Sequence, residues 1–292
     1  MNESIDKFLK TIQEIRDPKS GCVWNLKQSH ASLKRYLLEE SYETLEAIDK
    51  VDEAIPNAFA ELKEELGDLL LQIVLHSRMA EEKGLFSFND VVDSVNQKMI
   101  NRHPHVFGKD LASNTKEVDK LWDAEKAKEK SERNSIFDGI PRELPALAAA
   151  WKISKKAVKE SFEWDAEEKL WGQLDSEIIE FKEVIENYRK QSGKDPYRDD
   201  YDDARVRNDA ELELGDILFT VVNIARWYKI DPEDALRKVN NKFITRFNVM
   251  VDICKSENKK MNEYSIDQLE AMWQKAKTLL NGSLRSRSIG AE

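Results

Sequence analysis

The stretch Glu61–Val74, "ELKEELGDLLLQIV", carries carboxylates at Glu61, Glu65 and Asp68 in the first two turns of an otherwise apolar helical pattern. A second stretch at 209–222, "DAELELGDILFTVV", repeats the pattern. At 100° per residue, these three acids of the first stretch, and Asp209, Glu213 and Asp216 of the second, fall on one narrow side of a helix between apolar residues, and no lysine lies on that side. We therefore expect two helices that each place acidic groups beside a buried surface.

These two stretches belong to a longer internal repeat, whose landmarks recur in the same order at separations of about 140 to 150 residues. "NQKMINRH" pairs with "NNKFITRF", and "LWDAEKAK" pairs with "AMWQKAKT". The polar, glycine- and proline-containing stretch between the copies is typical of a linker. The predicted organisation is a first helical domain at 1–130, a linker at 131–145, a second helical domain at 146–280 and a disordered tail at 281–292.

Composition limits the fold and the partners. Of the 292 residues, 40% are hydrophobic and 35% charged, and 10 Gly and 7 Pro are few for an all-β fold. The long segments are rich in good helix formers, which predicts an all-α protein with two tandem helical bundles. A net charge of −10 argues against a nucleic-acid partner. We expect a cytoplasmic protein without a membrane partner, because long apolar runs, a signal peptide and a cysteine framework are missing.

The helix before each acidic stretch supplies a second acidic pair, Glu40 with Glu43 and Glu177 with Glu180. One such pair usually marks a solvated helix face, but two facing pairs in both copies form two sets of four carboxylates. Without a cation these groups would repel one another, and oxygen ligands without histidine suit Mg²⁺, with Mn²⁺ as the second choice. The predicted metal ligands are Glu40, Glu43, Glu65 and Asp68 in the first copy, and Glu177, Glu180, Glu213 and Asp216 in the second.

Basic and aromatic residues follow each acidic set at helical spacing. A recurring Lys/Arg pair near a metal site is typical of phosphate binding, and a tryptophan offers a flat surface for a base. A lone helical Trp, however, is more often a core residue. The predicted substrate-binding residues are Lys98, Arg102, Trp122 and Lys126 in the first copy, and Trp164, Lys242, Arg246, Trp273 and Lys277 in the second.

At this point the sequence resembles a known family. The pattern E-E-x-x-E at Glu39, Glu40 and Glu43, then E-x-x-D at Glu65 and Asp68, is similar to that of the all-α nucleoside triphosphate pyrophosphohydrolases. The tandem copies and the motifs "GCVWN" and "RHPHVFG" resemble the two-domain MazG proteins. The resemblance implies helical bundles paired as a homodimer. It also implies Mg²⁺-dependent hydrolysis of NTPs and dNTPs to the monophosphate and pyrophosphate, for house-cleaning or nucleotide-pool control.

Some positions depart from the family pattern. Ser176 stands where the family has glutamate, Val23 and Asn25 replace its proline and aspartate, and a charged insertion separates Glu180 from Glu213. Both copies keep four acids, so neither is excluded as a catalyst. The resemblance and the complete basic and aromatic set favour the second copy. The hypothesis is in-line attack of water on the α-phosphorus, with the catalytic residues Glu177, Glu180, Glu213 and Asp216 holding Mg²⁺.

Two other interpretations compete with this one. A ferritin-like di-iron protein is also helical with paired acids, but its site requires E-x-x-H on two helices, and no acid here has His three residues later. A non-catalytic helical dimer that binds a nucleotide or a protein partner stays open as the alternative, because Ser176 and the insertion weaken the second copy.

Overall fold

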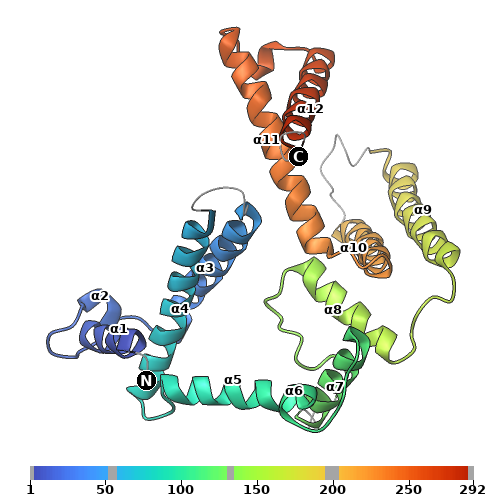
Figure 1. The fold of residues 1–292 in the computed structure, drawn as a ribbon. Helices are drawn as coiled ribbons and strands as arrows, with labels where there is room; N and C mark the ends of the chain where they lie inside the picture. The colour runs from blue at the N-terminus through green and yellow to red at the C-terminus, as the bar shows by residue number, and fades with distance from the viewer. Residues whose placement is uncertain (1–2, 52–57, 130–134, 195–203, 289–292) are drawn as a thin grey trace. The chain divides into compact units, whose positions relative to one another are not determined.

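The computed structural model describes residues 3–51, 58–129, 135–194 and 204–288, and every regular element within these ranges is a helix (Figure 1). This confirms the predicted all-α fold. The chain divides into two compact units, Met1–Glu132 and Arg133–Glu292. The first unit contains α1 (Glu3–Ile15), α2 (Val23–Leu26), α3 (His30–Lys50), α4 (Ala58–Glu81), α5 (Phe88–Arg102), α6 (Pro104–Phe107) and α7 (Thr115–Lys128). The second contains α8 (Ala146–Lys159), α9 (Glu167–Ser192), α10 (Ala204–Trp227), α11 (Pro232–Ser256), the 3₁₀ turn η1 (Met261–Glu263) and α12 (Ile266–Ser288).

Both units have the same plan. A long helical hairpin, α3–α4 or α9–α10, packs against a shorter helix, α1 or α8, and a second hairpin, α5–α7 or α11–α12, continues from it. The core of the first unit lies where α1 meets the hairpin, and its buried residues are Ile12, Leu33, Val74, Leu75 and Met79. In the second unit Leu170 and Val222 are fully buried. The acidic stretches therefore form the second helix of each long hairpin.

Capping residues set where several of these helices begin. The side chains of Ser29 and Asn114 accept hydrogen bonds from backbone N–H groups in the first turns of α3 and α7. Asp231 does the same for α11, which has Pro232 in its first turn. Such caps satisfy amide groups that have no partner inside the helix. Gly193 ends α9 at a left-handed φ of 67°, a conformation that glycine adopts without steric cost.

Two helices extend beyond the sequence-based boundaries. Helix α9 continues to Ser192, into the segment interpreted as a charged insertion, whose residues 195–203 lie outside the described ones. Helix α12 continues to Ser288, through most of the tail expected to be disordered. The α9 extension contains the good helix formers Arg189, Lys190 and Gln191, whereas the α12 extension contains a glycine and three serines. Each nevertheless lengthens an existing helix. Extending a helix is favourable because each added residue contributes a further backbone hydrogen bond without a new nucleation step.

An arginine–glutamate pair fastens the end of each long hairpin to the segment that follows the short helix. In the first unit, Arg16 follows α1 and pairs with Glu82 after α4 through two hydrogen bonds of 2.9 Å. In the second unit, Glu163 follows α8 and pairs with Arg226 of α10 at 2.5 Å, one turn before Ile230, which aligns with Glu82. Both arginines are almost buried, so removing either glutamate would leave a nearly buried arginine without its anion.

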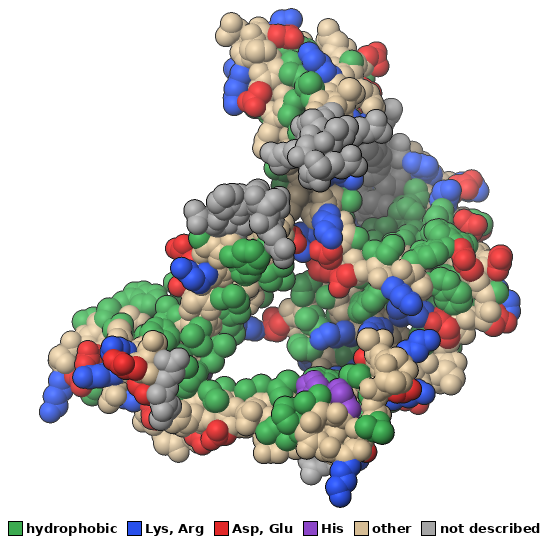
Figure 2. Space-filling view, viewed as in Figure 1, with side chains coloured by type: hydrophobic (Ala, Val, Ile, Leu, Met, Phe, Trp, Pro, Cys, Tyr) green, Lys and Arg blue, Asp and Glu red, His purple; other side chains and the backbone are tan. Residues whose placement is uncertain are grey.

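The long hairpins leave part of their apolar surface exposed (Figure 2). On α3, the apolar residues at helical spacing, Leu38, Tyr42, Leu45 and Ile48, are 53%, 46%, 42% and 50% exposed. The same is true on α10, where Leu214, Leu218 and Val221 lie at helical spacing and are 46%, 49% and 43% exposed. Isolated exposed apolar residues are normal, but contiguous stripes on this scale mark interaction surfaces.

Two histidines join α3 to α4 in the first unit. The Nδ1 atoms of His30 and His76 lie 2.8 Å apart, and the ring planes differ by 14° with centroids 5.1 Å apart. Rings that meet edge to edge through their nitrogens have this separation, so one Nδ1–H donates to the other Nδ1. The His76 Nε2 is buried without a partner. Burial lowers the pKa of His76, and the neighbouring His30 lowers it further. Both effects favour the neutral form of the His76 imidazole.

We expect the folded state to lose stability as the pH falls. Because the folded pKa of His76 is lowered, the unfolded chain binds more protons at acidic pH, and the free energy of unfolding decreases below about pH 6.5. Urea unfolding at pH values between 7.5 and 5, followed through the tryptophan fluorescence of the first unit, measures the slope of the free energy of unfolding against pH. His76→Ile introduces the residue found at the aligned position of the second unit, Ile224, and should flatten it. An unchanged slope in this variant would contradict the assignment.

Candidate metal and phosphate site

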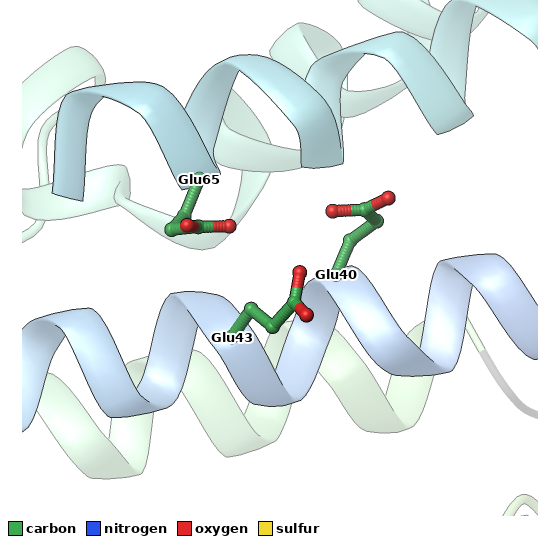
Figure 3. Close-up of side chains that lie close together, drawn as sticks. All are labelled: Glu40, Glu43 and Glu65. Carbon is green, nitrogen blue, oxygen red and sulfur yellow. The ribbon is translucent and has the colours of Figure 1, made fainter. Parts of the chain in front are cut away.

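The long hairpin of the first unit brings three predicted ligands together. Glu40 and Glu43 project from α3 and Glu65 from α4, and Figure 3 shows all three side chains in the space between the two helices. One carboxylate oxygen of each lies within 4.8 Å of the others. The i, i+3 spacing on α3 and the close packing of α3 with α4 produce this convergence. The sequence pattern therefore places acids from two helices in one site.

The carboxylates of this site influence one another strongly. Burial raises the pKa of Glu40, and Asp68, Glu43 and Glu65 raise it further by repulsion. The pKa of Glu65 is raised by burial and then by Glu43 and Asp68. Asp68 therefore lies near the three converging carboxylates, although it is not one of them. Among the described residues, no lysine or arginine pairs with any of these four acids.

The second unit repeats the arrangement with a different closest group of three. Carboxylate oxygens of Glu177, Glu213 and Asp216 lie within 4.8 Å of one another. Burial and then repulsion from Glu180 raise the pKa of Glu213, so Glu180 is the fourth member of this set. Ser176, which stands where the family has glutamate, donates a hydrogen bond of 2.8 Å to Glu180. The substitution therefore gives Glu180 a neutral neighbour in place of an acidic one.

These donor sets fit a hard divalent cation. Each offers carboxylate oxygens without nitrogen or sulfur ligands, as Mg²⁺ and Mn²⁺ prefer. In the described part of the chain, the histidines lie outside both groups. The raised pKa values of Glu40, Glu65 and Glu213 indicate repulsion that a bound cation would relieve. The assignment of individual ligands stays a prediction.

All of the predicted substrate-binding residues except Trp164, which lies between α8 and α9, are on the second hairpin of their unit. In the first unit, the Arg102 guanidinium lies 5.1 Å from the centre of the Trp122 ring. In the second, Arg246 lies 5.8 Å from the Trp273 ring. These pairs join α5 to α7 and α11 to α12. The remaining predicted residues are the exposed Lys98, Lys126 and Lys242 and the half-buried Lys277 and Trp164.

The acidic and basic sets of one unit do not come together within that unit. Figure 1 shows α7 at the far end of α5 from the α3–α4 hairpin, and α12 beside α11 and apart from the α9–α10 hairpin. The sequence pattern suggested adjacency because the residues follow one another along the chain. However, α5 and α11 run away from the acidic helices instead of folding back over them. A site that contains both the acidic and the basic set would need a different arrangement of these hairpins.

Sequence reasoning also missed one residue of the basic hairpin. Glu129, immediately after α7, accepts hydrogen bonds from the Arg102 Nε at 3.2 Å and Nη2 at 2.5 Å. No motif singled it out, because Leu280 occupies the corresponding place in the second copy. The only available signal was its spacing from Trp122, which brings it back to the same side of the helix.

The fold and the acidic hairpins define a class: a duplicated all-α protein with a carboxylate cluster between two helices in each half. The family model of the MazG nucleotide pyrophosphohydrolase domain matches the chain twice, at residues 28–107 and 166–251. Both matches contain the acidic hairpin of their unit and the following Lys/Arg pair. The chain belongs to the MazG nucleotide pyrophosphohydrolase family. The predicted resemblance and the prediction of an enzyme of this class are confirmed.

Curated relatives cover nearly the whole chain. It is 36% identical over 272 residues to the nucleoside triphosphate pyrophosphohydrolase/pyrophosphatase MazG of Thermotoga maritima, covering 93% of this chain and 95% of the relative. It is 36% identical over 283 residues to the nucleoside triphosphate pyrophosphohydrolase of Escherichia coli K12, covering 95% and 98%. The uncharacterized protein YabN of Bacillus subtilis is 37% identical over 271 residues, which are 92% of this chain and 51% of YabN.

Proposed function

We propose that this protein hydrolyses nucleoside and deoxynucleoside triphosphates to the monophosphate and pyrophosphate in a Mg²⁺-dependent reaction. The observation that carries the proposal is the convergence of three carboxylates within 4.8 Å in each unit, to which no lysine or arginine of the described residues is paired. The names of the curated relatives support a triphosphate substrate. The acidic neighbours of Glu40, Glu65 and Glu213 raise the pKa values of these groups, and a bound cation would remove this repulsion.

The acidic and the basic side chains have different proposed roles in the reaction. In the second unit, Glu177, Glu180, Glu213 and Asp216 would hold the ion. Bound Mg²⁺ would supply a positive charge for the phosphate oxygens and lower the pKa of an attacking water. Lys242, Arg246 and Lys277 would oppose the negative charge that builds up on the departing pyrophosphate. The water oxygen bonds to the α-phosphorus as the bond from that phosphorus to the bridging oxygen of the pyrophosphate breaks. A carboxylate near the site accepts the proton of the water.

A homodimer is part of the same proposal. Exposed apolar stripes on α3 and α10 need a partner surface, and the acidic and basic hairpins of one unit lie apart. A second copy would cover the stripes and bring a basic hairpin toward an acidic one. We also propose a cytoplasmic location, where the free Cys22 and Cys254 would stay reduced. No described helix is long and apolar enough to cross a membrane.

A pyrophosphate-release assay tests the activity. With each NTP and dNTP, we expect pyrophosphate and the monophosphate in equal amounts when Mg²⁺ or Mn²⁺ is present, and loss of release by at least about 100-fold after chelation, as expected when a metal supplies several kcal/mol of stabilisation. Orthophosphate as the product would contradict the proposed bond cleavage. Nucleotide binding without turnover under all metal conditions would favour the non-catalytic dimer. A role in house-cleaning or nucleotide-pool control follows from the activity.

A further inference from the structure

The two units differ in how they treat the arginine of the basic hairpin. In both, this arginine lies against the face of a tryptophan, Arg102 on Trp122 and Arg246 on Trp273. In the first unit the guanidinium also forms a two-point ion pair with Glu129. In the second unit, the Arg246 Nε is buried without a hydrogen-bond partner. The arginine at this position is therefore paired with a carboxylate in the first copy, whereas its Nε has no hydrogen-bond partner in the second.

The sequence explains this difference with a single position. Glu129 follows Trp122 at the spacing at which Leu280 follows Trp273. A carboxylate in the first copy thus corresponds to an aliphatic side chain in the second. Because the helices that carry these residues are equivalent, the residue at this position decides whether the guanidinium already has an anion.

The ion pair with Glu129 is stronger than an ordinary surface contact. The Arg102 side chain is 11% exposed and that of Glu129 is 27% exposed, so water screens the pair only partly. Two parallel N–H···O bonds to one carboxylate form the geometry in which arginine also binds phosphate. A phosphate group that approaches Arg102 must displace Glu129 and also meets its negative charge.

We propose that Glu129 occupies the phosphate-binding arginine of the first copy and so lowers the affinity of that copy for triphosphates, which leaves the second copy as the main binding site. This inference rests on the proposed function, since it assumes that the basic hairpins bind phosphate. Glu129 acts through Arg102 and is a positioning residue. The duplicated chain thereby has one basic hairpin whose arginine is already paired with a carboxylate and one whose arginine is not.

The first test removes the negative charge that pairs with Arg102 in the first copy. In full-length protein carrying Arg246→Ala and Lys277→Ala to weaken the second copy, a non-hydrolysable NTP analogue with Mg²⁺ is titrated by calorimetry. Adding Glu129→Gln should tighten binding about tenfold, and adding Arg102→Ala to that variant should remove the gain. Glu125→Gln is the matched control, because Glu125 lies on α7 and pairs with Lys128. It should change the affinity less than about twofold, since exposed ion pairs contribute little.

The second test places a competing carboxylate next to Arg246 in the second copy. Leu280→Glu in the otherwise unchanged protein should raise the KM for NTP about tenfold while kcat stays within about twofold. Leu279→Glu adds the same charge at an exposed neighbouring position and should leave both values nearly unchanged. Thermal unfolding of every variant identifies effects on folding. If Glu129→Gln does not fold, the result with Leu280→Glu decides the question.

Several results would overturn the inference. They are an unchanged affinity in folded Glu129→Gln, a gain that persists without Arg102, or an unchanged KM in Leu280→Glu. A lowered melting temperature with no gain in affinity would make Glu129 a structural residue only. Absence of Mg²⁺-dependent pyrophosphate release by the wild-type protein would contradict the proposed function itself. The calorimetric titration would still report whether Glu129 controls triphosphate affinity.

Discussion

Glu213→Gln is expected to reduce Mg²⁺-dependent pyrophosphate release by at least about 100-fold, the scale typical of losing an essential charged group in a preorganised site. Glutamine keeps the size of the side chain and its packing on α10. It removes one negative charge from a set in which burial and four neighbouring acids already raise the pKa of Glu213. The amide is a poor ligand for a hard cation, so metal affinity and turnover should fall together. Steady-state kinetics over a range of Mg²⁺ concentrations measure both.

Controls on both copies make this result specific. Glu211→Gln lies on the same helix but is exposed and should leave turnover nearly unchanged. Glu65→Gln makes the same change in the first copy and should have a much smaller effect, because the second copy is proposed to be the main site. If Glu213→Gln retains full turnover and Glu65→Gln abolishes it, the chemistry belongs to the first copy. Circular dichroism checks that each variant keeps its helical content.

Leu218→Glu is expected to weaken the proposed homodimer by at least about 100-fold, because burying a carboxylate without a partner costs several kcal/mol. Leu218 occupies the middle of the exposed stripe on α10, between Leu214 and Val221. In the isolated chain this side chain is half exposed, so the variant should still fold. Sedimentation velocity at micromolar concentration should show monomer, and activity should fall with it, because the acidic and basic hairpins would then stay apart.

The control for this variant is Leu111→Glu. Leu111 is 93% exposed and lies outside the helices, so the same charge there should leave the dimer intact. A monomeric wild-type protein that is fully active would contradict the homodimer and require the hairpins of one chain to close on each other. A dimer unaffected by Leu218→Glu would move the interface away from the α10 stripe.

Helical periodicity alone was sufficient to predict the parts of the molecule that depend on local spacing. The acidic stripe of α4 and the i, i+3 pair on α3 face each other as expected, because two antiparallel helices joined by a short loop have few ways to pack. The Arg–Trp pairs on the second hairpins follow from the same periodicity. The repeat made these expectations stronger, since each appears twice.

Periodicity could not predict how α5 and α11 leave the acidic hairpins. The direction of a helix after a turn depends on tertiary packing, and an apolar stripe has the same sequence pattern whether it faces its own core or another chain. The His30–His76 contact joins residues far apart in sequence at a single pair of atoms. Glu129 was missed because its role depends on Arg102, and one carboxylate on a charged helix carries no distinguishing pattern.

The pair of Arg16 with Glu82 has a consequence for folding. Tandem copies of one sequence can mispair, with a helix from one half docking on the other half. Ile230 follows α10 and aligns with Glu82, just as Arg226 aligns with Arg78. If α1 docked on α10, the nearly buried Arg16 would therefore meet an isoleucine and lose its anion, which is costly. The carboxylate at position 82 thus disfavours docking of the first short helix on the wrong half.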